Sequence, residues 1–202
     1  IYYLRNGRVP IRPVGYDYRR PVPGNTSATA WLGVHSIEDL IQVENPVSGF
    51  LQNCNINPER MTPVPEVRLA DYPDYLGNVG WDDWHSRGAR ALELLAVEDR
   101  LTIQRATEIC MDVAPYRGRE WAEATLRAAQ DRSRHPALPG LADALEALRN
   151  WDGAFLEDSV GAALLALQWN HLEGAKELLQ ASLFELRPLE PQEQDRLLTA
   201  LE

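Results

Sequence analysis

The first 80 residues alternate short apolar runs with turn-forming residues, a pattern typical of strands and loops. Nine of the 14 prolines lie in this part, and proline is excluded from helix interiors. Tyr2–Leu4 and Arg8–Arg12 flank Asn6-Gly7, which predicts a β-hairpin with a type I′ turn. Gly15–Asn25 is rich in proline and glycine and predicts a loop, and Phe50–Cys54 predicts a short strand.

From about residue 85 the apolar positions recur at helical spacing. Helices are predicted over Arg87–Ala96, Leu101–Val113, Gly118–Arg134, a segment marked by Leu141, Leu145 and Leu148, Val160–Trp169, and two shorter segments at 171–184 and 191–201. Val160–Trp169 is apolar on almost every side, which predicts a buried helix. We expect these helices to share a core that includes Leu145, Leu148, Leu164, Leu165, Leu167 and Trp169.

The sequence therefore predicts an α+β protein that is mostly helical. We place a β/loop segment at residues 1–80 and a helical region at residues 81–202, within a chain long enough for one large domain or two small ones.

The net charge limits the classes of partner. Lys and Arg total 20 and Asp and Glu total 30, which gives a formal net charge of -10. Nucleic-acid binding requires a cationic face, so we expect no nucleic-acid partner. No apolar run approaches the roughly 20 residues that span a bilayer, so we expect no membrane partner either.

The common catalytic motifs are absent from the sequence. The four histidines form no i, i+4 metal-binding pair, and neither a GxSxG elbow nor a Gly-rich phosphate loop occurs. Cys54 and Cys110 fit no zinc or redox spacing and predict two free thiols or one disulfide. Asp82-Asp83 lies between Trp81 and Trp84, where a polar loop held by two tryptophans is favoured over a carboxylate site.

Three segments, in sequence order, carry a more specific pattern. The first is Gly15–Gly24, GYDYRRPVPG. The second is Trp31–Gly33, followed by Glu38–Leu40 and then by Asn45–Asn55, NPVSGFLQNCN. The third is Ala147–Gly153, ALRNWDG, followed by the apolar helix that ends at Trp169. Together they resemble the β-chain of the penicillin acylase family. The Gln-Asn-Cys-Asn variant looks most similar to acyl-homoserine-lactone and lipopeptide acylases.

This resemblance implies an N-terminal nucleophile hydrolase that cleaves linear N-acyl amides. Its members have an αββα sandwich fold and arise by self-cleavage of a secreted zymogen. Their nucleophile is a serine at the new N-terminus, whose own α-amino group acts as the base. Ile1 is not such a residue, so we expect the nucleophile to lie outside this sequence. The chain would then be a fragment of the acylase and inactive alone.

The family's oxyanion motif matches Gln52–Asn55. The resemblance implies that the Asn55 side-chain amide, a donor that does not titrate, stabilises the tetrahedral intermediate. The alternative is an asparagine that caps a turn before Asn57-Pro58. The family also has an active-site arginine at the start of a helix, which matches Arg87; Arg90 is its rival if the register shifts.

Calcium and the missing partners are further implications of the resemblance. The Tyr18 backbone carbonyl matches one calcium ligand, and a carboxylate ligand should lie near Tyr72–Asp74. The other ligands would lie outside this chain, so the metal ligand set stays unknown. The chemistry itself requires no cofactor. The partners would be the α-chain, the rest of the β-chain and a small N-acyl substrate, in the periplasm or outside the cell.

A non-catalytic role is the alternative to hydrolysis. In that case the acidic helices between residues 85 and 202 would form an interaction module, and the β/loop segment would be its scaffold. An upstream serine at a self-cleavage site distinguishes the two roles. The nature of the acyl chain stays open among penicillin, homoserine lactone and lipopeptide substrates.

Overall fold

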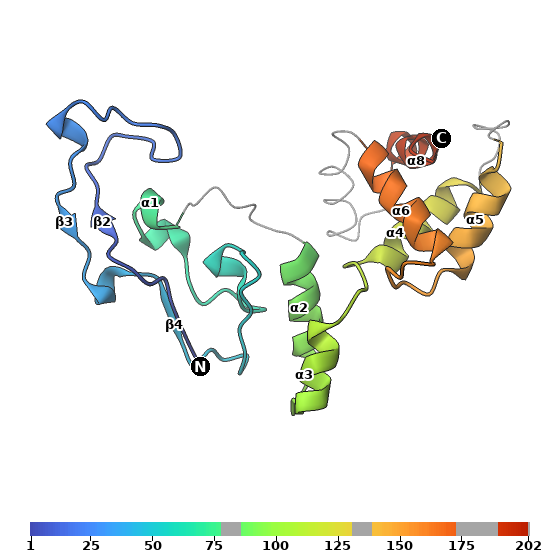
Figure 1. The fold of residues 1–202 in the computed structure, drawn as a ribbon, viewed down its shortest axis with the longest axis horizontal. Coiled ribbons are helices and arrows are strands. Elements are labelled where there is room, and N and C mark those ends of the chain that lie inside the picture. The colour runs from blue at the N-terminus through green and yellow to red at the C-terminus, as the bar shows by residue number, and fades with distance from the viewer. Residues whose placement is uncertain (78–85, 131–138, 173–189, 202) are drawn as a thin grey trace. The chain divides into compact units, whose positions relative to one another are not determined.

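The computed structural model describes residues 1–77, 86–130, 139–172 and 190–201, and it separates into two compact units (Figure 1). Unit 1 is Ile1–Cys110 and unit 2 is Met111–Glu202. The boundary predicted between residues 80 and 81 lies outside the described residues.

Unit 1 begins with two short antiparallel ribbons, one nested inside the other. Strand β1, Tyr2–Leu4, pairs with β4, Gln42–Glu44. Strand β2, Pro10–Ile11, pairs with β3, Gly33–Val34. The chain therefore runs out along β1 and β2 and returns along β3 and β4 (Figure 1). The reversal is the Pro/Gly-rich loop between β2 and β3, which confirms the predicted loop.

The hairpin predicted at residues 2–12 is wrong. A type I′ turn needs left-handed φ values at both central residues, whereas Gly7 has φ 135° and Asn6 has a negative φ. The strand Tyr2–Leu4 instead pairs with β4, where Tyr3 packs against an apolar cluster that contains Ile41 and Val43. The pairing with β4 places Tyr3 opposite Val43, whose side chain is buried in that cluster, and this burial favours β4 as the partner.

The strand predicted at Phe50–Cys54 is also wrong, because this segment is irregular. Its backbone groups are bound locally: Gln52 N donates to Met61 O at 2.9 Å, and the Gln52 side-chain Oε1 accepts from Cys54 N at 3.0 Å. Asn55 has φ 62°, which is left-handed and ends any extended run. Side chains within Gln52–Asn55 thus bind backbone N–H groups that a neighbouring strand would bind in a sheet.

Short helical turns connect these segments. Four 3₁₀ turns cover Ser27–Thr29, Ile37–Asp39, Pro58–Arg60 and Leu69–Asp71. They are followed by the one-turn helix α1, Asp74–Gly77. Unit 1 ends with α2, Ser86–Ala96, and α3, Ile103–Cys110.

Unit 2 is helical wherever the structure shows regular elements. Its helices are α4, Gly118–Ala128, α5, Leu141–Asn150, α6, Val160–His171, and α8, Pro191–Thr199. The predicted helices are confirmed, although α3 is shorter than Leu101–Val113 and α4 ends before Arg134. The segment predicted at 171–184 lies almost wholly outside the described residues. The mostly helical α+β class is confirmed. No helix of the described chain has the length and apolar character to cross a bilayer.

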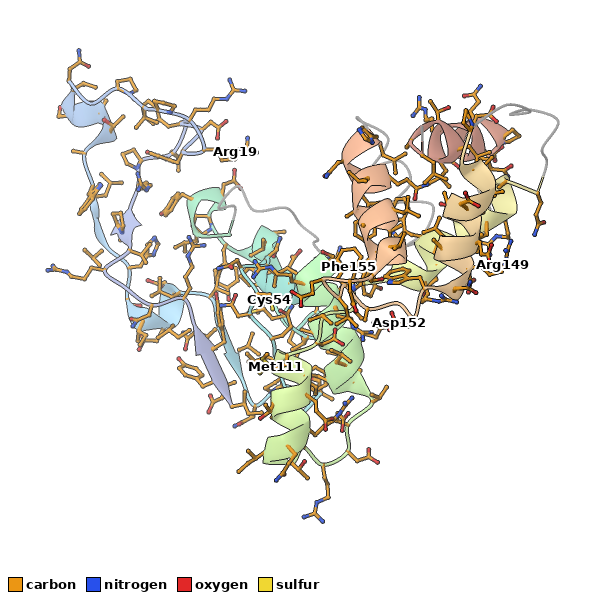
Figure 2. The ribbon with its side chains drawn as sticks, turned by 45° about the vertical axis from the view of Figure 1, so that its right-hand side comes forward. Arg19, Cys54, Met111, Arg149, Asp152 and Phe155 are labelled. Carbon is orange, nitrogen blue, oxygen red and sulfur yellow. The ribbon has the colours of Figure 1, made fainter. Side chains whose placement is uncertain are left out.

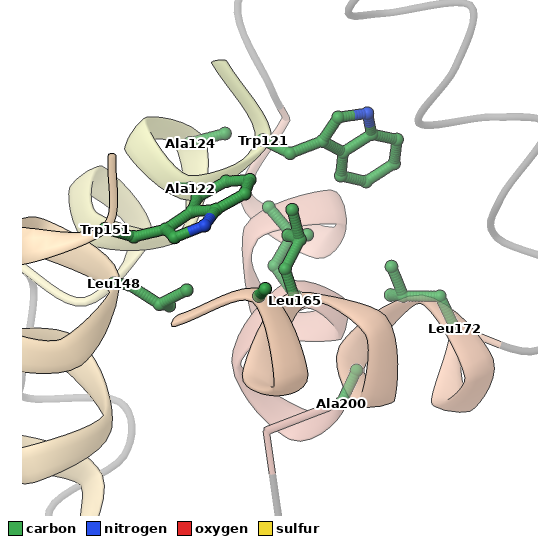
Figure 3. Packing of buried hydrophobic residues seen from close by; sticks show 10 residues of the cluster. Trp121, Ala122, Ala124, Leu148, Trp151, Leu165, Leu172 and Ala200 are labelled. Carbon is green, nitrogen blue, oxygen red and sulfur yellow. The ribbon is translucent and has the colours of Figure 1, made fainter. Parts of the chain in front are cut away.

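The core of unit 2 forms between α4, α5, α6 and α8 (Figure 3). Leu148 and Leu165 are completely buried, and Trp151 lies between α4 and α6 because Gly118 and Gly161 leave room for its ring. The predicted core residues are confirmed except for Leu167, whose exposed fraction is 54%. Helix α6 is therefore buried on one side only, and the fully buried helix predicted at Val160–Trp169 is wrong.

Candidate functional site

The candidate site is a loop whose two ends are tied together by Gln52. This side chain is buried, with 6% exposure, and its Nε2 donates to Arg60 O at 3.0 Å. Backbone N–H of the same residue donates to Met61 O at 2.9 Å. Met61 and Ile56 are buried in the apolar cluster of unit 1. Residues 53–60 therefore form a closed loop with both ends on a packed core.

Asn55 lies at the exposed turn of this loop. Its backbone N–H is bound by Asn53 Oδ1 at 3.2 Å, and its φ of 62° is tolerated because asparagine adopts left-handed conformations readily. Asn57 Oδ1 accepts from Glu59 N at 2.9 Å and caps the next 3₁₀ turn. The capping contacts in this loop are thus made by Asn53 and Asn57, while the Asn55 side chain is directed elsewhere.

Arg87 brings the start of α2 to this loop. Its Nη2 donates to Asn55 Oδ1 at 3.1 Å and to Cys54 O at 3.2 Å. Figure 2 marks the position of Cys54 in the loop. Arg90, one turn further along α2, pairs with Glu93 of the same helix at 2.7 Å. The structure therefore brings together the two residues expected at the site, Asn55 and Arg87.

The contact with Arg87 fixes which way the Asn55 amide faces. A guanidinium has only donors, so the amide atom that meets it must be the carbonyl oxygen Oδ1. The amide nitrogen Nδ2 then points away from Arg87, and it makes no hydrogen bond to the described residues. Both side chains are exposed in this chain. The arrangement can present a neutral N–H donor, backed by a cation, to a negatively charged oxygen atom.

The two segments expected to contribute to calcium binding also meet. The rings of Tyr18 and Tyr75 lie 5.8 Å apart, edge to face, and Arg19 interacts electrostatically with both Asp17 and Asp74. Hydrogen bonds from Arg19 hold the pKa of the Asp17 carboxyl below its usual value.

These residues do not form a calcium site by themselves. Calcium takes about six to eight oxygen ligands, and the described part of the chain contains no cluster of three or more potential metal-ligating side chains. Asp17 is paired with Arg19 at 2.8 Å and with Arg20 at 3.6 Å. The two arginine charges weaken the attraction of its carboxylate for a metal cation.

The remaining candidates are the acidic pair Asp82-Asp83, the two cysteines and His35. Asp82-Asp83 and its flanking tryptophans belong to the segment 78–85, which is not described. Cys54 and Cys110 are both free thiols, as one of the two sequence-based alternatives predicted. His35 Nε2 lies 2.9 Å from Tyr75 Oη and its Nδ1 lies 3.7 Å from Asp39.

Sequence reasoning did not assign any role to Gln52 beyond membership of the motif. The signal in the sequence was a glutamine directly after the apolar pair Phe50-Leu51, since a polar side chain that is buried beside apolar residues is normally hydrogen-bonded. Its three hydrogen bonds became evident only from the structure.

Comparisons with known proteins identify the family of the chain. The penicillin amidase family model matches residues 1–201. Penicillin G acylase from Escherichia coli is 37% identical to the chain over 67 residues, which make up 33% of this chain but 8% of the relative. The aligned part of the chain thus spans a small share of that relative's length. Because the family model covers nearly every residue, the chain belongs to the penicillin amidase family.

Proposed function

We propose that this chain is the part of an N-acyl amide hydrolase that supplies a side-chain donor to the oxyanion. The observation that carries the proposal is the hydrogen bond from Arg87 Nη2 to Asn55 Oδ1 at 3.1 Å, which turns the amide nitrogen away from the arginine. The family assignment supports the general reaction, the hydrolysis of a linear amide. The nucleophile would be an N-terminal serine outside this sequence, exposed by self-cleavage of a zymogen within an αββα fold.

In this reaction the serine oxygen attacks the acyl carbon of the substrate, and the carbonyl oxygen becomes negatively charged. Asn55 Nδ2 would donate a hydrogen bond to that oxygen, and the donor would be most effective where water is excluded. Arg87 would keep the amide in the donating orientation and add positive potential behind it. Because Asn55 and Arg87 are exposed here, the remaining acylase segments would cover them and complete the acyl pocket.

The surroundings of the enzyme follow from the same proposal. The partners are the α-chain, the rest of the β-chain and a small N-acyl substrate. The enzyme works in the periplasm or outside the cell, and a calcium ion, with ligands mostly from those other segments, has a structural role.

The test is removal of the Asn55 amide in the full-length, self-processed enzyme. Asn55→Gly deletes the donor and keeps the left-handed backbone accessible, whereas Asn55→Ala adds backbone strain. Loss of one oxyanion donor typically lowers kcat by roughly 10²–10³-fold, or about 3–4 kcal/mol. We expect a kcat loss of that order for both variants with little change in KM. Asn55→Asp should do no better, since a carboxylate has no donor and repels the oxyanion.

A matched control separates catalysis from backbone strain. Asn45 also has a left-handed φ, 46°, and is exposed, so Asn45→Ala carries a similar backbone cost away from the site. Self-processing of every variant is checked first by the masses of the chains, because failed cleavage would also abolish turnover. A correctly processed Asn55→Gly enzyme with nearly normal kcat would exclude the oxyanion role.

A further inference from the structure

Gln52 binds three backbone groups on the two sides of the Asn55 loop, two through its side chain and one through its backbone N–H. Its Nε2 donates to Arg60 O at 3.0 Å, and its Oε1 accepts from Cys54 N at 3.0 Å. Its own backbone N–H donates to Met61 O at 2.9 Å. The residue is 6% exposed, so water cannot easily replace these contacts when they are lost.

These contacts bear directly on the conformation of Asn55. A left-handed residue other than glycine costs about 1–2 kcal/mol and persists when its surroundings determine it. Gln52 holds Cys54, the residue before Asn55, through the Cys54 N–H. The carbonyl of the same Cys54 accepts from Arg87 at 3.2 Å. The peptide segment that leads into Asn55 is therefore held by Gln52 at one end and by Arg87 at the other.

We infer that Gln52 is a positioning residue for Asn55: its buried amide fixes the backbone from which the Asn55 donor projects. This inference rests on the proposed function, in which Asn55 meets the oxyanion. Gln52 itself touches no reacting atom in this scheme. Its effect on turnover should pass entirely through Asn55.

Two substitutions separate the two side-chain contacts. Gln52→Met keeps the length and burial of the side chain and removes both polar atoms. Gln52→Glu keeps an acceptor for Cys54 N and places a second carboxylate oxygen against Arg60 O. Thr62→Val is the matched control, because Thr62 is also buried, at 4% exposure, and donates to Val64 O at 2.8 Å outside the loop.

The experiment measures kcat and KM of the full-length, self-processed enzyme in two backgrounds, Asn55 and Asn55→Gly. Small displacements of a catalytic group can cost up to about a hundredfold in rate, so we expect Gln52→Met to lower kcat by roughly tenfold to a hundredfold, with KM within about twofold of normal. In the Asn55→Gly background the same change should have no further effect on kcat. Thr62→Val should leave kcat unchanged in both backgrounds.

The outcomes distinguish this inference from the proposed function. If Gln52→Met lowers kcat by the same factor in both backgrounds, or leaves it normal when Asn55 is present, the positioning role is overturned. If Asn55→Gly alone keeps nearly normal kcat, the oxyanion proposal fails, whatever Gln52 does. If Gln52→Met does not fold, Gln52→Glu is compared in the same two backgrounds and read in the same way.

Hydrogen exchange provides a readout that does not depend on turnover. Gln52→Met should accelerate exchange of the Cys54 amide, which loses its acceptor, while the Gly49 amide, bound to Pro46 O at 2.9 Å, should exchange as before. An unchanged Cys54 rate would contradict the inference.

Discussion

Replacing Arg87 with methionine tests how much the orientation of the Asn55 amide contributes to catalysis. Arg87 Nη2 binds Asn55 Oδ1 at 3.1 Å and Cys54 O at 3.2 Å, and methionine keeps much of the side-chain length without a donor. An unrestrained asparagine side chain has about three χ1 wells and about two amide orientations. About one arrangement in six then presents Nδ2 as it stands now, which predicts a kcat loss of about sixfold, or about 1 kcal/mol.

The assay is steady-state hydrolysis of an N-acyl amide by the full-length, processed enzyme, with Arg90→Met as the control. Arg90 pairs with Glu93 at 2.7 Å, so its loss should change kcat by less than about twofold. A loss for Arg87→Met as large as that for Asn55→Gly would refute the reasoning, because Arg87 would then contact the reacting groups itself. An unchanged kcat would also refute the reasoning, because the Asn55 amide would then keep its orientation without Arg87. A large loss for Arg90→Met alone would move the arginine assignment to Arg90.

Two further predictions concern the stability of unit 2, measured by urea unfolding followed by tryptophan fluorescence. Gln168→Met should destabilise the chain by about 2 kcal/mol, since it leaves the buried Leu197 carbonyl, bound by Gln168 Nε2 at 2.8 Å, without a donor; an effect under about 0.5 kcal/mol would contradict this. Gly161→Ala should destabilise by about 1–3 kcal/mol, because its Cβ would lie 2.5 Å from Trp151 Cβ. Ala163→Gly, at an exposed position of the same helix, serves as the control and should cost no more than about 1 kcal/mol.

The helices were predictable because their signal is local. In α5 the spacing of Leu141, Leu145 and Leu148 repeats over the whole element, and Gly118 and Pro191 mark the starts of α4 and α8. Such periodicity depends only on neighbours three or four residues apart. The start of α2 beside Arg87 was likewise predicted to within one residue.

The strands were not predictable in the same way, because each partner lies far along the chain. Tyr3 pairs with Val43, some forty residues away. The dipeptide Asn6-Gly7 is typical of a tight hairpin turn, and its sequence alone does not reveal that the chain forms no hairpin there. Asn55 and Arg87 were expected at the site only through a family resemblance. Their contact depends on the folding of unit 1, and the part played by Gln52 required the backbone acceptors to be located first.

The buried amide of Gln168 has a consequence for how α6 is set within its bundle. The apolar residues of Val160–His171 occur on all sides of the helix, so hydrophobicity gives it little preference for any rotation about its own axis. Gln168 breaks this symmetry, since its amide finds partners only where it meets Thr125 Oγ1 at 2.9 Å and the Leu197 carbonyl at 2.8 Å. Any other rotation would bury that amide unpaired or leave the end of α8 without a donor. One polar side chain thus selects a single rotational setting, leaving Leu167 on the solvent side and Leu165 in the core.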